Sequence, residues 1–358
     1  MVSTRASAGK KKCLVTGGAG FLGKHLVDKL LASGKYDVVV FDIRDSGDPR
    51  VSTIVGDLRD PKQVEDALAG VEVVFHCATA APAAANTANK TLMYDVNVKG
   101  TQNIIDGCVA QSVNKLVYTS SASVVFDGKD LINADESMPY AQKPIDYYTE
   151  TKILGERLVL SSNKRSGLAT VALRPSGIFG EHDPLLVPLT VANAKKGKMK
   201  YIIGSGKNLM DFTYVGNVAQ AHLLAADALE EGTHSKCAGR AYFITNADPQ
   251  PFWGFLGDFL EPLGYMRPSK KLPWQLIFAI AVIVQFIISL LKPFKEIPPS
   301  EFTPMRIRIA KANRQLDCSR AREDLGYIPE VSINDALDRT VKHFAHLRNP
   351  DGGKEKPS

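Results

Sequence analysis

The sequence predicts a doubly wound α/β fold, in which helices cover both faces of a parallel β-sheet. Between residues 12 and 180, short runs rich in β-branched residues alternate with stretches of helical periodicity. The run YDVVVFDI is almost continuously apolar, as expected for a strand that is buried on both faces. Right-handed crossovers place the carboxyl ends of such strands along one edge of the sheet, where we expect the site.

The first three strands and two helices have clear boundaries. The strand at 12–16 runs directly into a glycine-rich turn, and the helix after it ends at Gly34, which suits a left-handed C-cap. Asp60 can cap the second helix, with Pro61 at its first position. The second and third strands are expected at 36–43 and 51–58.

The same order of strand and helix continues to residue 180 and then loosens. Strands are expected at 71–78, 114–124 and 168–180, and helices between them at 95–112 and 147–164. We therefore divide the chain into a polar tail at 1–10, a sheet domain at 11–180, a smaller substrate-binding α/β lobe at 181–348 and a polar tail at 349–358.

Composition narrows the possible classes of protein. The 358 residues are 44% hydrophobic and 23% charged, which is typical of globular proteins rather than disordered or fibrous ones. The net charge of +6 comes from short clusters without a basic helix or an aromatic platform, so we expect no nucleic-acid partner. The cysteines form no CxxC pair, and we expect no metal site from them: Cys13, Cys77, Cys108, Cys237 and Cys318.

The motif TGGAGFLG, residues 16–23, predicts a loop that binds the pyrophosphate of a dinucleotide. Its three glycines allow a tight turn, a close approach of the backbone to the phosphates, and close packing of helix on strand. A purely structural turn is the alternative, but this motif joins the first strand to the first helix. The expected cofactor contacts are Gly17, Gly20, Phe21, Leu22 and Gly23, which makes 11–180 a Rossmann-type domain.

An acidic residue ends the second strand where an adenosine ribose is expected. Asp42 lies 19 residues beyond Gly23, and its carboxylate can accept hydrogen bonds from the ribose while repelling a 2′-phosphate. We therefore expect NAD as the cofactor, with NADP as the alternative because Arg44 lies two residues further on. Asp57 and Leu58 can reach the adenine; otherwise Asp57 is an ordinary loop acid.

The segment DYYTETK contains a candidate general base. Tyr148 and Lys152 are four residues apart on a predicted helix and share one face, whereas Tyr147 has no lysine at that spacing. A nearby ammonium lowers the pKa of a phenol from about 10 towards the working pH. We therefore expect Tyr148 to accept a proton from a substrate hydroxyl, with a serine of TSSASV, residues 119–124, holding the same oxygen.

These motifs together resemble the extended short-chain dehydrogenase/reductase superfamily. The resemblance rests on TGGAGFLG, Asp42, TSSASV and the segment YTETK. The longer strings KPIDYYTETK, RPSGIFG and KNLMDFTYVGNV, with a late apolar run, are similar to the 3β-hydroxysteroid dehydrogenase group, especially members that act on 4α-carboxysterols. The similarity extends roughly over residues 11–348.

The resemblance implies a role for each matching residue. Tyr148 is implied to be the base and Lys152 its electrostatic partner and ribose ligand. Ser121 is the implied orienting hydroxyl, with Ser120 and Ser123 left as alternatives.

Further residues around the implied site have less specific roles. Pro175 and Gly177 are implied to border the nicotinamide. Asn97 is expected to hold the structure, relay a proton or bend its helix, and His76 to pack beside the cofactor. The residue that binds a substrate carboxylate is not identified; Arg174 and Lys207 are candidates.

The implied reaction is oxidation of a sterol 3β-hydroxyl by NAD. A carboxylate at C4 would make the product a β-keto acid, and its new carbonyl accepts the electron pair left by departing CO₂. Alternatives are a steroid dehydrogenase/isomerase, a reductase of phenolic carbonyls, a nucleotide-sugar epimerase, and a nucleotide-sensing membrane scaffold without turnover. Implied partners are a sterol-like substrate, a second copy of the chain and other enzymes of sterol C4 demethylation.

The uncharged run at 275–291 predicts a membrane-associated helix within 272–292. At about 1.5 Å per residue it is roughly 25–30 Å long, just enough for a bilayer core. A buried core helix, a single span and a helix or hairpin inserted from one side are all possible. The apolar stripe of the helix starting near Ser332 needs the substrate lobe as its partner, and a single span would split that lobe. We therefore expect insertion from the cytosolic side, and the resemblance implies the endoplasmic reticulum membrane.

Overall fold

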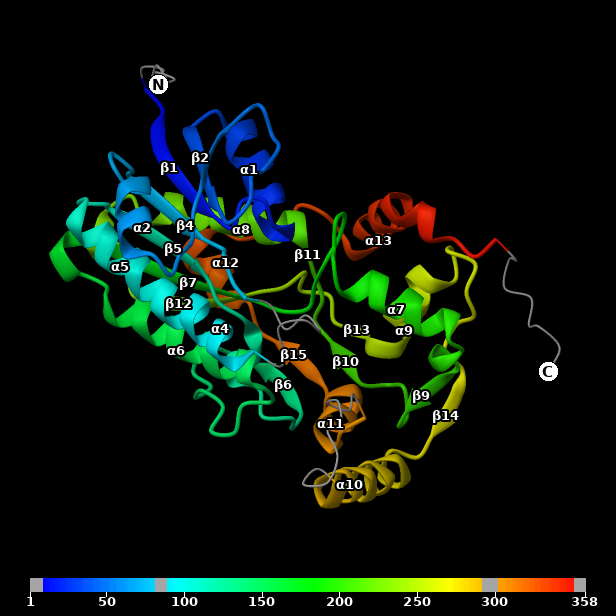
Figure 1. The fold of residues 1–358 in the computed structure, drawn as a ribbon. Helices are drawn as coiled ribbons and strands as arrows, with labels where there is room; N and C mark the ends of the chain where they lie inside the picture. The colour runs from blue at the N-terminus through cyan, green and yellow to red at the C-terminus, as the bar shows by residue number, and fades with distance from the viewer. Residues whose placement is uncertain (1–8, 81–88, 292–301, 351–358) are drawn as a thin grey trace.

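A seven-stranded parallel sheet forms the centre of the molecule, and helices cover both of its faces (Figure 1). The computed structural model describes residues 9–80, 89–291 and 302–350. The strand order is β12-β7-β5-β4-β1-β2-β3, and every adjacent pair is parallel, so the predicted fold class is confirmed. The strands are β1 (Lys11–Thr16), β2 (Tyr36–Asp42), β3 (Ser52–Val55), β4 (Val73–His76), β5 (Lys115–Thr119), β7 (Ala169–Pro175) and β12 (Arg240–Ile244).

Two groups of helices bury their apolar stripes against this sheet. One core lies between the sheet and α1 (Phe21–Ser33), α8 (Val215–Ala228) and α12 (Ser319–Leu325). The other lies under α2 (Pro61–Ala67), α5 (Gly100–Ala110) and α6 (Tyr147–Ser161). The predicted caps are present, because Gly34 adopts a left-handed conformation and the Asp60 side chain accepts amide hydrogen bonds from the first turn of α2.

The sheet takes its last strand from beyond residue 180. β12 pairs with β7, and α8 and α12 cover the same face as α1, although all three come from the range predicted for the substrate lobe. The sheet domain therefore includes residues beyond 180. The start of the substrate lobe at residue 181 stays a prediction. The strand order reverses between β1 and β4, which is where ligands bind in open α/β sheets.

A third core contains elements of the smaller lobe. α13 (Ile333–His343) packs its predicted apolar stripe there against α7 (Leu186–Lys195) and α9 (Phe252–Leu260). A four-stranded sheet, ordered β13-β10-β15-β6, lies beside it. Its strands are β6 (Leu131–Ala134), β10 (Leu209–Met210), β13 (Gln250–Pro251) and β15 (Arg314–Leu316). Two short pairs complete the lobe: β8 (Ile178–Phe179) with β11 (Thr213–Tyr214), and β9 (Tyr201–Ile203) with β14 (Lys270–Leu272).

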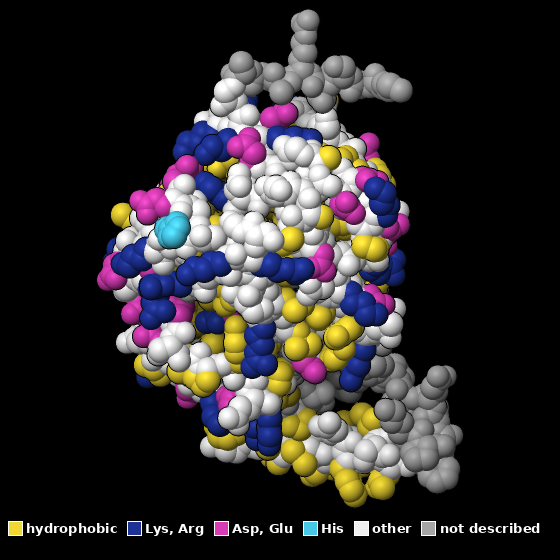
Figure 2. All heavy atoms as spheres, turned by 90° about the vertical axis from the view of Figure 1, so that its left-hand side faces the viewer, with side chains coloured by type: hydrophobic (Ala, Val, Ile, Leu, Met, Phe, Trp, Pro, Cys, Tyr) yellow, Lys and Arg dark blue, Asp and Glu magenta, His cyan; other side chains and the backbone are white. Residues whose placement is uncertain are grey.

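The apolar run forms α10 (Trp274–Leu291), which lies on the outside of this lobe. Within α10 only Ala281 is buried, so the alternative of a buried core helix is wrong. One side rests on α11 (Pro304–Lys311), where Lys311 lies over the Trp274 ring. Figure 2 shows hydrophobic side chains at the lower end of the molecule, where Figure 1 places α10. Among the described residues, α10 is a helix long and apolar enough to cross a membrane, judged by length and composition alone.

Candidate active site

The glycine loop between β1 and α1 has the geometry that its motif predicts. Gly17 has a φ of +71°, and a Cβ added to Gly23 would lie 2.1 Å from the Gly17 carbonyl oxygen. Gly20 caps α1, and no side chain accepts a hydrogen bond from the first turn, which begins with Phe21, Leu22 and Gly23. Amide groups at an uncapped helix N-terminus are a suitable site for a phosphate.

Asp42 lies beside this loop. Its Oδ2 accepts a hydrogen bond from the Ala19 amide at 3.1 Å, and its Oδ1 accepts one from the Arg44 amide at 3.3 Å. The Arg44 guanidinium donates to the Ala19 carbonyl at 3.2 Å. The carboxylate is therefore fixed next to the phosphate loop, where the sequence places a ribose contact.

Asp57 and Leu58 follow β3 at the same edge of the sheet. The Asp57 carboxylate pairs with Arg59 at 2.5 Å, and this hydrogen-bonded pair lowers the pKa of Asp57. Leu58 is buried against Gly100 at the start of α5. The Leu58 side chain thus belongs to the core, and contact of either residue with an adenine stays a prediction.

Lys152 projects from α6 towards the carboxyl end of β5. Its ammonium is buried, donates to the Thr119 carbonyl at 2.5 Å and lies 4.4 Å from the centre of the Tyr118 ring. Burial lowers the pKa of Lys152 to about 8. Tyr148 lies one turn earlier on the same helix, so α6 brings both predicted residues to the sheet edge.

The acidity of Tyr148 differs from the prediction. Burial, and then the Asp146 carboxylate, raise the pKa of Tyr148 to about 12, against a hydrogen bond with Thr79 that lowers it. The predicted lowering by Lys152 is therefore wrong for this structure. The Lys152 ammonium is bound to the Thr119 carbonyl, and desolvation of the phenolate dominates.

The serines of TSSASV leave the strand that the sequence predicts for them. β5 ends at Thr119, and Ser121 caps a 3₁₀ turn, Ala122–Val125. Its hydroxyl lies 2.9 Å from the Ser123 hydroxyl, which accepts a hydrogen bond from Thr149 of α6 at 3.3 Å. Ser121 and Ser123 thus form a chain of hydroxyls that reaches the helix carrying Tyr148.

Asn97 connects three parts of the site. It lies in a single π turn, Asp95–Lys99, between α4 (Lys90–Tyr94) and α5, and such turns are frequent at functional sites. Its Oδ1 accepts hydrogen bonds from the Thr79 hydroxyl at 3.0 Å and the Ala80 amide at 2.7 Å, and its Nδ2 donates to Thr151 of α6. Asn97 therefore both marks a distortion of its helix and holds Thr79 beside Tyr148.

His76 is enclosed in the sheet. Its Nδ1 lies 2.7 Å from the Thr16 hydroxyl and its Nε2 lies 3.0 Å from the Thr101 hydroxyl. Burial, and then the Lys152 charge, lower the pKa of His76 to about 3, so the imidazole is neutral. Both ring nitrogens are engaged, which supports the packing role over a catalytic one.

Pro175 and Gly177 lie where β7 ends. Pro175 pairs in register with Ile244 of β12, and Gly177 has a φ of +50°. A Cβ at Gly177 would lie 2.7 Å from the flexible end of the Met210 side chain, so the positive φ is the main reason that this position needs glycine. This turn separates β7 from β8, where the sequence predicted one continuous strand.

Sequence reasoning missed the buried ion pair that holds α6. Arg174 of β7 donates to both carboxylate oxygens of Glu156, which lies one turn beyond Lys152, and the Tyr140 hydroxyl donates to the same carboxylate at 2.7 Å. The Nε and Nη2 atoms of Arg174 are therefore taken up by α6, and only Nη1 is left without a partner among the described residues, so Arg174 is poorly suited to bind a substrate carboxylate through two N–H groups. The only sequence signal was an acid four residues after Lys152 on a helix.

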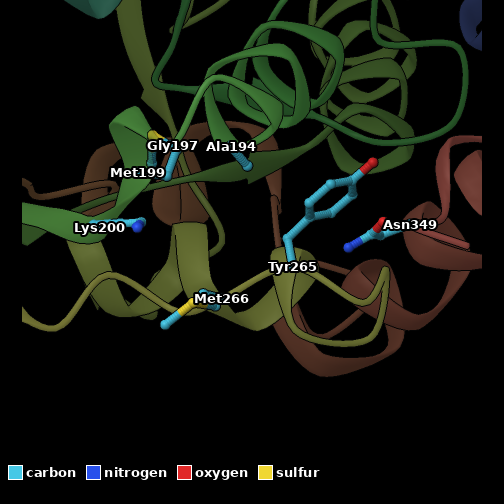
Figure 3. Close-up of a pocket in the computed structure, with 7 residues that line it drawn as sticks. All are labelled: Ala194, Gly197, Met199, Lys200, Tyr265, Met266 and Asn349. Atoms are coloured by element: carbon cyan, nitrogen blue, oxygen red, sulfur yellow. The ribbon is translucent and has the colours of Figure 1, made fainter. Parts of the chain in front are cut away.

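The pocket in Figure 3 belongs to a different region. Its volume is about 100 Å³, below the usual range of roughly 300–1,000 Å³ for ligand sites. None of the predicted site residues lines it; the lining residues are Ala194, Gly197, Met199, Lys200, Tyr265, Met266 and Asn349.

The sheet, the glycine loop and the Tyr–Lys pair on α6 define the class of extended short-chain dehydrogenases and epimerases. More narrowly, the chain belongs to the 3-beta hydroxysteroid dehydrogenase/isomerase family, whose sequence profile matches residues 14–274. It is 48% identical to "Sterol-4-alpha-carboxylate 3-dehydrogenase, decarboxylating" of Bos taurus, over 94% of each chain. The Mus musculus protein of the same name is 46% identical, over 94% of this chain and 92% of its own. The fold is similar to the UDP-glucose 4-epimerase of Thermus thermophilus complexed with NAD, with a TM-score of 0.69 and 25% identity, over 93% of this chain and 98% of the epimerase.

Proposed function

We propose that this protein oxidises the 3β-hydroxyl of a 4α-carboxysterol with NAD and releases the C4 carboxylate as CO₂, a step of sterol biosynthesis. The observation that carries the substrate class is the 48% identity to a decarboxylating sterol-4-alpha-carboxylate 3-dehydrogenase over 94% of both chains. The epimerase shares the fold at 25% identity, and a soluble nucleotide sugar gives no reason for the exposed apolar face of α10.

The residues at the glycine loop suit NAD. The uncapped first turn of α1 would hold the pyrophosphate, and the close contact between Gly23 and the Gly17 carbonyl leaves no room for a side chain there. Asp42 would bind the adenosine ribose and disfavour the 2′-phosphate of NADP. When bound, NAD supplies the hydride acceptor for the C3 hydrogen.

The proton of the 3β-hydroxyl goes to Tyr148 in this proposal. Lys152 lies one turn further along α6, and its buried ammonium, which donates to the Thr119 carbonyl in this structure, would bind the cofactor ribose. Ser121, at the start of the 3₁₀ turn that follows β5, holds the substrate oxygen, and Asn97 keeps Thr79 in place beside Tyr148. These roles remain proposals.

Loss of CO₂ then needs little further machinery. The C4–carboxylate bond breaks, its electron pair enters the bond between C3 and C4, and the carbonyl oxygen becomes an enolate. Tyr148, now protonated, and Ser121 can donate hydrogen bonds to that oxygen, which stabilises the developing charge. A proton is later added at C4 to give the 3-ketone.

Turnover of three substrates tests this function. Purified protein with NAD should form NADH and CO₂ from a 4α-carboxy-3β-hydroxysterol. Efficient oxidation of a carboxyl-free 3β-hydroxysteroid with movement of its double bond would favour the dehydrogenase/isomerase alternative. Conversion of UDP-glucose would favour an epimerase, and absence of turnover with all three would favour a non-catalytic role.

We also propose that α10 inserts into the cytosolic leaflet of the endoplasmic reticulum membrane without crossing it. Large apolar side chains are exposed on its outer face, including Phe286 (62%) and Leu290 (55%), and such a patch is typical of a lipid-facing surface. The chain after α10 returns to the same body, because β15 pairs with β6 and β10. A crossing helix would leave that sheet on both sides of the bilayer.

Protease treatment of sealed microsomes tests this topology. A C-terminal tag should be digested without detergent, since the tail stays on the cytosolic side. Full protection of the tag would support a single span. Homodimerisation and association with other enzymes of sterol C4 demethylation stay predictions from the family resemblance.

A further inference from the structure

Arg314, a partly buried cation of the smaller lobe, has no counterion among the residues that the structure describes. Arg314 begins β15, and its Nε and Nη2 atoms are buried without a hydrogen-bond partner among residues 9–80, 89–291 and 302–350. Its guanidinium lies over two aromatic rings, 5.8 Å from the centre of Phe126 and 5.4 Å from the centre of Phe252. Burial alone lowers the pKa of Arg314, to about 10, with no acidic group opposing it.

This position adjoins the candidate active site from two directions. Phe126 immediately follows the serine turn, and its amide donates to the Ser123 carbonyl at 3.0 Å. Met210 is the register partner of Arg314 in β10, and the Met210 side chain reaches Gly177 at the end of β7. Arg314 therefore lies on the lobe side of the segments that carry Ser121 and Gly177.

The buried acid beside the register partner of Arg314 does not neutralise this arginine. Asp211 follows Met210, so its side chain projects to the opposite face of the small sheet from that of Arg314. Its Oδ2 accepts a hydrogen bond from the Leu316 amide at 2.8 Å, and burial raises the pKa of Asp211 to about 6. By contrast, Arg174, which the sequence offered as a carboxylate donor, already has Glu156 as a bidentate counterion, and only its Nη1 lacks a hydrogen-bond partner among the described residues.

A desolvated guanidinium without an anion is costly, and two parallel N–H groups match the two oxygens of a carboxylate. Nε and Nη2 form such a pair on one edge of the planar group. Of the two flanking rings, Phe126 is buried in the core, and the partly exposed Phe252 offers apolar surface of the kind that a sterol ring requires. Charge and shape together favour an amphiphilic ligand that carries a carboxylate.

We propose that Arg314 binds the C4 carboxylate of the substrate through Nε and Nη2. This inference rests on the proposed function and names the subsite that the sequence left unidentified. Arg314 keeps the carboxylate ionised, as loss of CO₂ requires, and orients C3 towards Tyr148. It thereby selects sterols that carry the acid over those that do not.

The test compares Arg314→Met with the wild type on two sterols. The substitution keeps an unbranched apolar stem and removes the charge. KM for the 4α-carboxysterol should rise about 10- to 100-fold, the loss expected for charge-assisted hydrogen bonds, and kcat/KM for the carboxyl-free sterol should not fall. Arg314→Lys should recover part of the loss, and Arg322→Met, on the exposed side of α12, should have no effect.

The outcomes distinguish a failure of this inference from a failure of the proposed function. No decarboxylation by the wild type would reject the proposed function. Wild-type decarboxylation with an unchanged KM in Arg314→Met would reject only the role of Arg314. If Arg314→Met does not fold, thermal stabilisation of the wild type decides: the carboxysterol should stabilise it more than the carboxyl-free sterol, and equal stabilisation overturns the inference.

Discussion

At the residue scale, burial determines the pKa of ionisable side chains at the carboxyl edge of the sheet. Lys152 is buried, with its pKa lowered to about 8, and the Tyr148 phenol has a pKa of about 12. Both shifts result mainly from desolvation, which disfavours the charged form of each group. In this structure the loss of a proton from Tyr148 therefore costs more free energy than it does in water.

Tyr148→Phe should reduce turnover by roughly 10²–10⁴-fold, because it removes the only phenol that shares a helix face with Lys152. NAD affinity, measured by fluorescence titration, should change little. Tyr147→Phe is the matched control, since the Tyr147 ring lies instead near Lys90. Equal losses in the two variants would contradict the assignment of Tyr148.

Asp211 should make the stability of the protein fall as the pH rises towards 6. Its pKa is about 6 in the folded protein and about 3.9 in an unfolded chain, so the folded state binds the proton more tightly. This contribution is complete below about pH 4 and is lost as the pH rises through 6. Asp211→Asn should therefore stabilise the protein at pH 7.5 by ~1–3 kcal/mol, and by much less at pH 4.5, in urea unfolding. A gain independent of pH would contradict this explanation.

The role of a residue could be predicted from the sequence where it depends on neighbours along the chain. It could not be predicted where it depends on segments distant in the chain. Gly17 and Gly23 were predictable because a local turn excludes a Cβ. The pKa of Tyr148 and the isolation of Arg314 were not, because desolvation depends on segments distant in the chain. The sequence likewise offered no reason to prefer Arg314 over Arg174.

At the scale of elements, α6 is fixed to the sheet by one buried ion pair. Glu156→Gln should destabilise the protein by ~3–5 kcal/mol, because Arg174 would keep a buried charge without a full partner. Asp106→Asn is the control: its pair with Arg165 is half exposed on both sides, and its loss should cost less than about 1 kcal/mol. Similar costs measured by denaturant unfolding would refute the special role of the α6 pair.

α10 should bind lipid through its outer face. Phe286→Glu combined with Leu290→Glu should reduce vesicle binding by about 10²-fold or more, because each buried apolar side chain contributes ~1.5–3 kcal/mol. Flotation with anionic vesicles measures the binding. Ile328→Glu combined with Leu189→Glu changes two similarly exposed apolar residues elsewhere and should leave binding intact. Unchanged flotation of the α10 variant would show that this face does not contact lipid.

Element boundaries show what periodicity can and cannot predict. The caps at Gly34 and Asp60 follow from local hydrogen bonding and were predictable. The apolar run predicted α10, whose exposure only the fold could reveal. The serine turn at 121–125 and the π turn at 95–99 continue the patterns of the neighbouring strand and helix, so periodicity did not distinguish them.

At the scale of the whole molecule, the sheet and the smaller lobe are interleaved along the chain. The parallel arrangement of six strands was predictable from their alternation with helices. β12 was not predictable, because a long segment of the smaller lobe separates it from β7 in the chain. The folding of the smaller lobe against the sheet brings β10 and β15 next to the segments that carry Ser121 and Gly177. A carboxylate subsite can therefore arise only in the assembled molecule.

The central claim is that one site oxidises C3 and releases the C4 carboxylate from the same sterol. A single-turnover experiment with a sterol deuterated at C3 and labelled with ¹⁴C in the carboxylate measures both events together. We predict one deuterated NADH and one labelled CO₂ for each sterol consumed, with the 3-ketone as product. Deuterated NADH formed while the label stays in the sterol would contradict the claim.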